Sequence, residues 1–404
     1  MVARIYTWQF DLPLYNLVPF IVERLSLETD FLNEAKNAEK MAELVANEPR
    51  LRGRVYIPRV YHGLSSRRVM TAEWIEGVRL WDKRGLTGTW QGRASQGSPG
   101  AGNTPLPTKT HQTSGLASNG LPNADLKPNR EQWKGRDRTG GLGVSLGDVM
   151  QIMVDLFSAQ MFLFGWLHCD PHPGNIFVRR LPGTGKPEIV LIDHGLYVNL
   201  EDRFRLQYCL LWKSLLIFDN STLQKIIESW GMRNADIFAS ATLMRPYTGG
   251  DNSTSAEIRK GLKGKEQIDR AFEAQQKMKH GIKEILADEK KWPQELIFIG
   301  RNLRIVQGNN QYLGSPVNRI RITGEWASRS LVDDPRLTFR EKLRRYAQHL
   351  LFKFVLFQTD VWFYASKVRQ LFGHSGGMED DIEVQMKHMA KDMGVELNHS
   401  VFEG

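Results

Sequence analysis

The hydrophobic positions of the chain predict helices first and strands next. Within residues 12–47, apolar side chains recur at intervals of three and four, the spacing of one helix face. Residues 55–61 and 68–75 are β-branched and aromatic runs separated by a turn-like stretch, which predicts two strands. The chain therefore begins with helices followed by a strand pair.

Residues 88–142 have no periodicity and are rich in Gly, Ser, Thr and Pro. Such a composition cannot bury enough apolar surface to order itself. A structureless loop of this length does not belong inside a compact core. We expect a disordered insertion between two folded parts.

Helical patterns dominate after the insertion. A strongly apolar helix starts near residue 145 and ends at Gly165, and residues 203–230 predict another. Residues 245–265 are Gly- and Lys-rich and are expected to be loose, before helices resume over 266–310 and 337–372.

Composition indicates a folded protein of a reducing compartment. The net charge of +9 is compatible with an acidic partner, but a solvated basic face is the preferred interpretation. Because no Lys/Arg block is interleaved with aromatics, we expect no nucleic-acid partner. The two cysteines, Cys169 and Cys209, form no disulfide framework.

The apolar segment 349–372 is the best candidate for a membrane span, but charged residues interrupt it. It suits either an interfacial helix on an anionic membrane or, the preferred interpretation, a core helix. The first residues match neither a signal peptide nor an Arg- and Ser-rich presequence.

The chemistry is concentrated in one segment. His168, Asp170 and Asn175 follow the apolar helix with the spacing H-x-D-x-x-x-x-N, and after a predicted hairpin an apolar strand leads to Asp193 in D-x-G. Protein kinases use this pattern. The first Asp orients or deprotonates the attacking hydroxyl or water, while the Asn and the second Asp supply oxygen ligands to Mg²⁺.

Two simpler interpretations are weaker. Each motif alone occurs by chance, but their conjunction is specific. A metal site of His168, Cys169 and His172 is disfavoured, because Pro171 and Pro173 prevent the helical spacing that would bring both imidazoles together.

The strings HCDPHPGN (168–175) and LIDHGLY (191–197) resemble the signatures of the UbiB-type, or aarF-domain, atypical kinase family. The resemblance extends to residues 27–35, 54–77 and 311–319. It implies an α+β, protein-kinase-like fold with a mostly helical C-lobe. It also implies binding of ATP and Mg²⁺, and, for the D-H-G-L-Y branch in eukaryotes, a mitochondrial location.

The resemblance also implies roles for single residues. Asp170 would be the catalytic-loop aspartate, His168 would be a catalytic residue with it, and Asn175 and Asp193 would be the Mg²⁺ ligands. Glu34 would be the helix glutamate that pairs with the ATP-binding lysine, and the family's E-x-D pair would be Glu28 and Asp30. Residues alone would predict a solvated helix face for these last three acids.

Parts of the family pattern are missing. The sequence shows no phosphate-covering loop, no V-A-x-K strand and no K-x-G-Q motif before residue 28, and no A-P-E segment after residue 195. We therefore expect an incomplete N-lobe over 1–87, the insertion 88–142, a C-lobe over 143–372 with its catalytic segment at 165–197, and a polar tail over 373–404.

Three functions remain open at this point. The first is a UbiB-like kinase or ATPase that supports mitochondrial lipid or coenzyme Q homeostasis, with nucleotide and lipid or quinone intermediates as partners. The second is a small-molecule phosphotransferase of the aminoglycoside or choline kinase type. The third, favoured by the missing lysine and loop, is a pseudokinase or lipid-binding scaffold.

Overall fold

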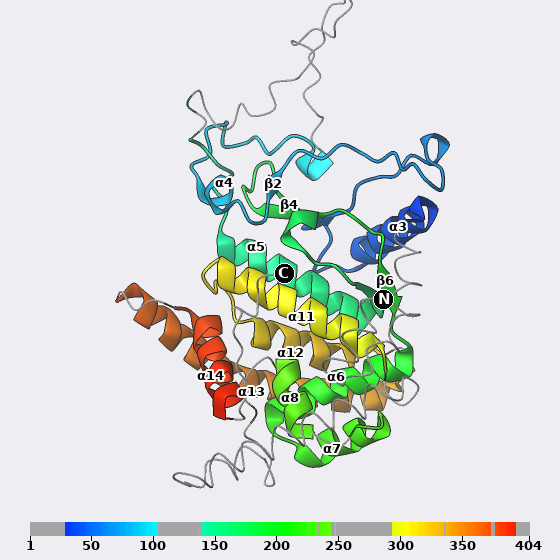
Figure 1. Ribbon diagram of the computed structural model, residues 1–404, viewed down its shortest axis with the longest axis vertical. Helices are drawn as coiled ribbons and strands as arrows, with labels where there is room; N and C mark the ends of the chain where they lie inside the picture. The colour runs from blue at the N-terminus through cyan, green and yellow to red at the C-terminus, as the bar shows by residue number, and fades with distance from the viewer. Residues whose placement is uncertain are drawn as a thin grey trace, which may run out of the picture. The chain divides into compact units, whose positions relative to one another are not determined.

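The computed structural model describes residues 29–103, 137, 139–232, 235–243, 247, 293–334, 336–372 and 376–392 (Figure 1). The predicted helices before residue 29, the loose stretch 248–265, the helix expected over 266–292 and the tail after 392 lie outside these residues. The chain forms two compact units. We call residues 34–153 and 172–194 the sheet unit, and the remainder the helical unit.

The sheet unit is built on four strands in the order β1-β5-β4-β2. The predicted hairpin is confirmed: β4 (Ile176–Arg180) pairs antiparallel with β5 (Pro187–Leu191). β1 (Val55–Tyr56) joins β5 in parallel, and β2 (Val78–Arg79) joins β4 antiparallel. All of β5 is buried, which explains its uninterrupted apolar run.

The other elements of the sheet unit are short, apart from one helix. α3 spans Phe31–Asn47 and α4 spans Lys83–Thr87, with 3-10 turns at His62–Leu64 and Ala101–Asn103. The strands predicted over 55–61 and 68–75 are mostly irregular. Beyond β1, isolated bridges at Val60–Ala72 and Ser66–Val69 hold them.

The two ends of the stretch 88–142 differ from the predicted disorder. Ser98 is 1% exposed, its N–H donates to the Arg180 carbonyl at 2.8 Å, and its Oγ accepts from the Arg180 N–H at 2.8 Å. At the other end Leu142 is fully buried and its N–H donates to the Gly85 carbonyl at 2.7 Å. Composition misses this order because the stabilising partners lie elsewhere in the sequence.

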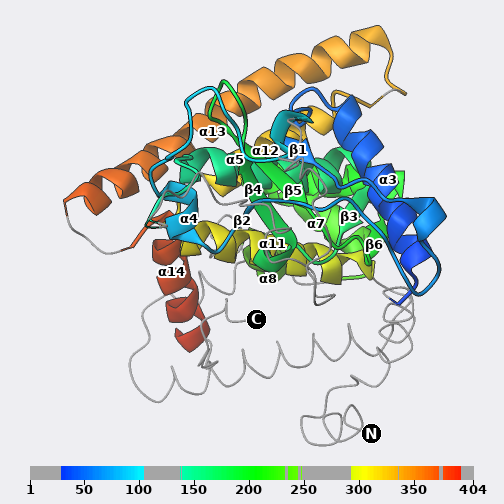
Figure 2. The ribbon, with the colours of Figure 1, turned by 90° about the horizontal axis from the view of Figure 1, so that it is seen from above.

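The helical unit contains a two-stranded ladder, β3 (Trp166–His168) with β6 (Tyr197–Asn199), besides its helices (Figure 2). α5 (Leu146–Ala159) continues as a π turn, Gln160–Phe164, and its second half belongs to this unit. The remaining helices are α6 (Asp202–Ile217), α7 (Asn220–Ser229), α8 (Ala235–Leu243), α11 (Glu295–Tyr312), α12 (Arg319–Ser330), α13 (Phe339–Leu371) and α14 (Met378–Asp392).

The helix predicted over 203–230 is two helices. Phe218 adopts a left-handed conformation, with φ 58°, at the end of α6, and the Asp219 carboxylate then caps α7 by accepting from Thr222 N–H at 3.1 Å. An aspartate followed by Asn-Ser-Thr is an N-cap signal that periodicity alone overlooks.

α13 confirms the helix predicted over 337–372 and is the long orange helix of Figure 2. One face packs against α12 and α6 through Phe352, Leu356 and Phe363. Within the described residues, one helix, Leu146–Phe164, is long and apolar enough to cross a membrane by length and composition alone. It is 72% buried, which is equally typical of a core helix.

Candidate functional site

The β4–β5 hairpin brings Asn175 and Asp193 to the same end of the sheet unit. Asn175 immediately precedes β4, and Asp193 is the second residue after the end of β5. The Ile192 N–H donates to the Asn175 carbonyl at 2.9 Å, so the pairing continues to the residue before the aspartate. Both predicted metal ligands thus leave one strand pair where it ends.

Asp193 has a backbone conformation rare for a residue with a Cβ. Its φ is 64°, in the left-handed region, and its side chain is exposed. Asp tolerates this region better than most residues, but at a cost of order 1–3 kcal/mol for such strained positions. A strained aspartate at the end of a buried strand is typical of a functional turn.

α3 holds the turn that follows Asp193. The Glu34 Oε1 accepts from the His194 N–H at 3.1 Å, and the Asn37 Nδ2 donates to the His194 carbonyl at 2.9 Å. Glu34 is only 6% exposed. Burial raises its pKa, the His194 N–H lowers it in part, and the Asp193 charge raises it again.

The His194 side chain closes the same turn. Its ring is 3% exposed, and Nε2 lies 3.1 Å from the Leu191 carbonyl, which can only accept. The backbone around Asp193 is therefore fixed by β5 before it and by two side chains of α3 after it.

In the helical unit, His168 is a positioning residue for Asp170. It ends β3, is 1% exposed, and its Nδ1 accepts from the Asp170 N–H at 3.0 Å. Its ring packs edge-on against Phe157 and Tyr197. The imidazole thus shapes the loop that carries the aspartate, and its ring stays inside the unit.

The Asp170 carboxylate is partly exposed and has a cationic partner. Its Oδ1 accepts from Arg301 Nη2 of α11 at 2.9 Å, with 36% of the Asp170 side chain accessible. An exposed pair of this kind stabilises the fold by about 0–1 kcal/mol, so its main effect is on the orientation of the carboxylate.

α11 supplies two further contacts that the sequence analysis misses. Asn302 Nδ2 donates to the His168 carbonyl at 2.9 Å, and Asn309 Nδ2 lies 3.4 Å from the Pro171 carbonyl. Both asparagines are buried. The signal in the sequence was a pair of asparagines seven residues apart, a spacing that places both on one face of a helix.

The remaining predicted residues fall elsewhere. Glu28 lies outside the described residues. Asp30 precedes α3, where its carboxylate accepts from the Leu32 N–H at 3.1 Å in the manner of a helix cap. Asn175, Asp193 and Glu34 are in the sheet unit, whereas His168 and Asp170 are in the helical unit.

The ligand atoms of the sheet unit fit a magnesium ion. Mg²⁺ prefers one or two carboxylate or amide oxygens, with water and phosphate filling the other positions. An exposed carboxylate and an amide at one hairpin end match this set. Among the described residues, no cluster of three His, Cys, Asp or Glu side chains could hold a metal instead.

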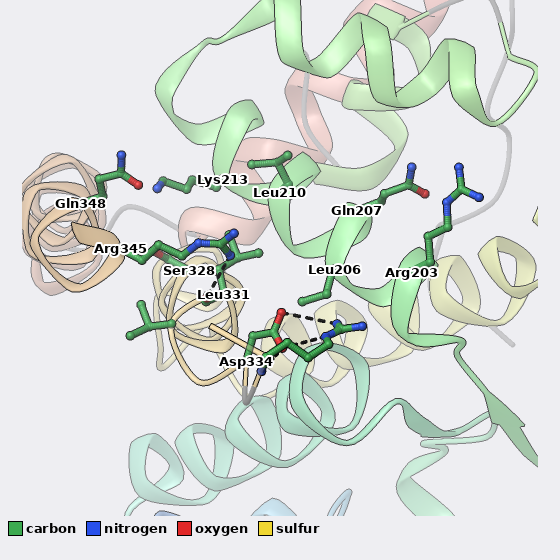
Figure 3. Close-up of a pocket in the computed structure, with 12 residues that line it drawn as sticks. Arg203, Leu206, Gln207, Leu210, Lys213, Ser328, Leu331, Asp334, Arg345 and Gln348 are labelled. Atoms are coloured by element: carbon green, nitrogen blue, oxygen red, sulfur yellow. Dashed lines mark hydrogen bonds and ion pairs between the residues drawn. The ribbon is translucent and has the colours of Figure 1, made fainter. Parts of the chain in front are cut away.

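The helical unit also contains a pocket of about 550 Å³ (Figure 3). Arg203 and Gln207 of α6 lie on one side, and Arg345 and Gln348 of α13 on the other. Burial, and then the Arg345 charge, lower the pKa of Lys213 in its wall. None of the predicted site residues lines it.

Two features define a protein of the α+β, kinase-like class. One is the D-x-G turn after a buried hairpin, where a helix glutamate accepts a hydrogen bond from the backbone. The other is the H-x-D loop, which lies in the helical unit. A family model for the ABC1 atypical kinase-like domain matches residues 1–96 and 131–227. The predicted fold class and family are therefore confirmed.

Several similar proteins carry names of the same family. The ABC1 family protein lscO of Purpureocillium lilacinum is 38% identical over 377 residues, covering 93% of this chain and 56% of that protein. An ABC1 family protein of Schizosaccharomyces pombe is 30% identical over 336 residues, 83% of this chain and 51% of that protein. AarF domain-containing protein kinase 1 of Gallus gallus is 32% identical over 215 residues, 53% of this chain and 30% of that protein.

The chain belongs to the ABC1 atypical kinase-like family. It spans about half the length of the two fungal relatives.

Proposed function

We propose that the chain binds Mg²⁺-ATP and transfers or hydrolyses its terminal phosphate. The observation that carries this proposal is the end of the hairpin, where Asn175 and the left-handed Asp193 emerge together and Glu34 holds the next N–H. A turn held on both sides keeps two oxygen ligands in place before the metal binds, which reduces the ordering cost of binding.

Each residue has a distinct role in this proposal. Asn175 and Asp193 hold the ion, which when bound neutralises charge on the phosphates. Asp170 orients the attacking hydroxyl or water and accepts its proton. His168 fixes the backbone of Asp170 through the 3.0 Å hydrogen bond, and Arg301 holds the carboxylate oxygen until a substrate hydroxyl replaces it.

Thermal unfolding with Mg²⁺-ATP, with ATP plus chelator and without ligand tests binding. A ligand at about 100 times its Kd stabilises a protein by roughly 2.7 kcal/mol. We expect a Mg²⁺-dependent rise in the midpoint that Asp193→Ala abolishes. The matched control is Asp333→Ala, which removes another exposed carboxylate, one that pairs with Arg329 four residues earlier. No shift in the folded chain would refute the proposal.

A second candidate is a nucleotide-binding scaffold without turnover, and the Arg301–Asp170 pair favours it. An arginine on the catalytic carboxylate competes with a substrate hydroxyl for the same oxygen. Arg301→Gln should raise ATP turnover if the pair restrains catalysis, whereas Arg304→Gln, an exposed arginine of the same helix, should leave it unchanged. Absent turnover in both variants, with ATP bound, supports the scaffold.

We also infer a mitochondrial location and a role in lipid or coenzyme Q homeostasis, with a lipid or quinone intermediate as a partner. The support is the similarity of residues 191–197 to the D-H-G-L-Y branch of the family. Subcellular fractionation tests the location, and quinone and phospholipid content in cells that carry only Asp193→Ala tests the role. Unchanged lipids and quinones would exclude that role.

A further inference from the structure

α13 has a second apolar face on the side opposite its packed one. The exposed apolar side chains follow each other at alternating intervals of four and three residues, over nine positions. They are Leu343, Ala347, Leu350, Phe354, Phe357, Val361, Tyr364, Val368 and Leu371. We call these nine residues the α13 seam. Apolar residues at a and d positions through four heptads are the pattern of a helix that pairs with another helix.

The seam is exposed along its whole length. Apart from Ala347, its side chains are between 50 and 85% exposed, and Leu351 and Phe372 beside it are 72 and 79% exposed. The eight large side chains of the seam, together with Leu351 and Phe372, would give roughly 1,000 Å² per copy at roughly 100 Å² each. A stable protein interface needs about 800 Å² from each partner, so this seam is large enough for one.

Three of the charges that flank the seam have partners inside the same unit. Lys353 Nζ lies 2.8 Å from the Glu325 carboxylate, and Asp360 lies 2.9 Å from Arg321 Nε. Lys367 Nζ donates to the Gly314 carbonyl at 3.0 Å. Lys353 and Lys367, committed in this way, contribute little to attraction by an anionic lipid surface, which favours an apolar protein partner over the interfacial helix that the sequence analysis also considered.

We propose that the α13 seam is the docking surface for a second copy of this chain, as an antiparallel pair of α13 helices about a two-fold axis. Antiparallel pairing about residue 359 places every seam residue from 347 to 371 opposite another one. The layers, with a prime for the second copy, are Ala347 with Leu371′, Leu350 with Val368′, Phe354 with Tyr364′ and Phe357 with Val361′.

The antiparallel arrangement follows from side-chain size. In a parallel pair each residue meets itself, so two phenylalanines would share a layer while two alanines shared another. In the antiparallel pair three of the four layers match a larger side chain with a smaller one. This keeps the separation of the helix axes even, and that separation depends on the side chains at each contact.

Sedimentation velocity of the full chain at about 10 µM tests the proposal, because interfaces of this size have dissociation constants at or below the micromolar range. We expect a dimer that Val361→Glu converts to a monomer. Val69→Glu is the matched control, since Val361 and Val69 are 57 and 58% exposed. Circular dichroism should show all three proteins equally folded. A monomeric wild-type chain, or a dimer that Val361→Glu leaves intact, overturns the proposal.

Disulfide trapping tests the direction of the pair and does not depend on the glutamate variant. The two native cysteines are buried, so any disulfide between copies forms between the introduced thiols. Mixing Phe354→Cys with Tyr364→Cys should give the heterodimeric disulfide. A Phe354→Cys homodimer as the main product would indicate a parallel pair and overturn the arrangement. Wild-type chain that stays monomeric and binds phosphatidylglycerol vesicles through the seam would identify a lipid surface and overturn it too.

Discussion

The contact between Glu34 and the His194 N–H makes the sharpest prediction about the turn after Asp193. Glu34→Ala removes the acceptor of a buried N–H, and an unsatisfied buried donor costs about 1–3 kcal/mol. Glu34→Gln keeps an amide oxygen in place and removes a charge that burial and Asp193 both disfavour. We therefore expect a clear loss of stability for the alanine variant and little or none for the glutamine variant.

Thermal or urea unfolding measures the difference. A change of 1 kcal/mol moves the midpoint by about 2–4 °C in a domain of 150–250 residues, so the alanine variant should unfold several degrees earlier. If the unfolding midpoint of Glu34→Gln falls as far as that of Glu34→Ala, the hydrogen bond does not hold the turn, and the reasoning is refuted.

The pH dependence gives an independent check. Because burial raises the folded pKa of Glu34 above the ordinary value of 4.5 for a glutamate, the folded state binds this proton more tightly than the unfolded state. The stability linked to Glu34 is therefore present at low pH and is lost as pH rises through the folded pKa. Glu34→Gln does not titrate, so its stability relative to wild type should grow over that window. A stability difference between Glu34→Gln and wild type that does not change with pH would contradict the raised pKa of Glu34.

Three further predictions concern the framework. Asn302→Ala should cost about 1–3 kcal/mol of unfolding free energy, because it removes the buried side-chain amide that donates to the His168 carbonyl. An unchanged urea midpoint would contradict this. Arg319→Met should cost about 3–5 kcal/mol by stranding the fully buried Glu379, and adding Glu379→Met should recover most of it in a double-mutant cycle. Burial and Glu73 raise the pKa of Tyr56 to about 12, so stability should fall between pH 10 and 12, less so in Tyr56→Phe.

The sequence predicted what depends on local spacing. The hairpin that joins Asn175 to Asp193 is visible as two apolar runs around a Gly-rich turn, and the structure pairs them. The D-x-G motif likewise marks a turn. Periodicity and short motifs are sufficient here, because each element is specified by neighbours in the chain.

Contacts between distant segments were not predictable in the same way. Arg301 is 131 residues from Asp170, and Asn37 is 157 residues from His194, so no spacing rule connects them. The order of residues 88–103 depends on Arg180 for the same reason. α13 was predicted as a helix, but its two apolar faces become distinct only when one is seen to be buried.

The central claim is that Asn175 and Asp193 bind a divalent ion together with ATP. Titration of the chain with Mn²⁺, followed by the electron paramagnetic resonance signal of the free ion, measures this directly, because Mn²⁺ replaces Mg²⁺ at oxygen ligands. We predict that ATP bound to the chain causes loss of free-ion signal beyond that of ATP alone, and that Asn175→Ala and Asp193→Ala each abolish the excess. Equal binding by wild type and both variants would contradict the account.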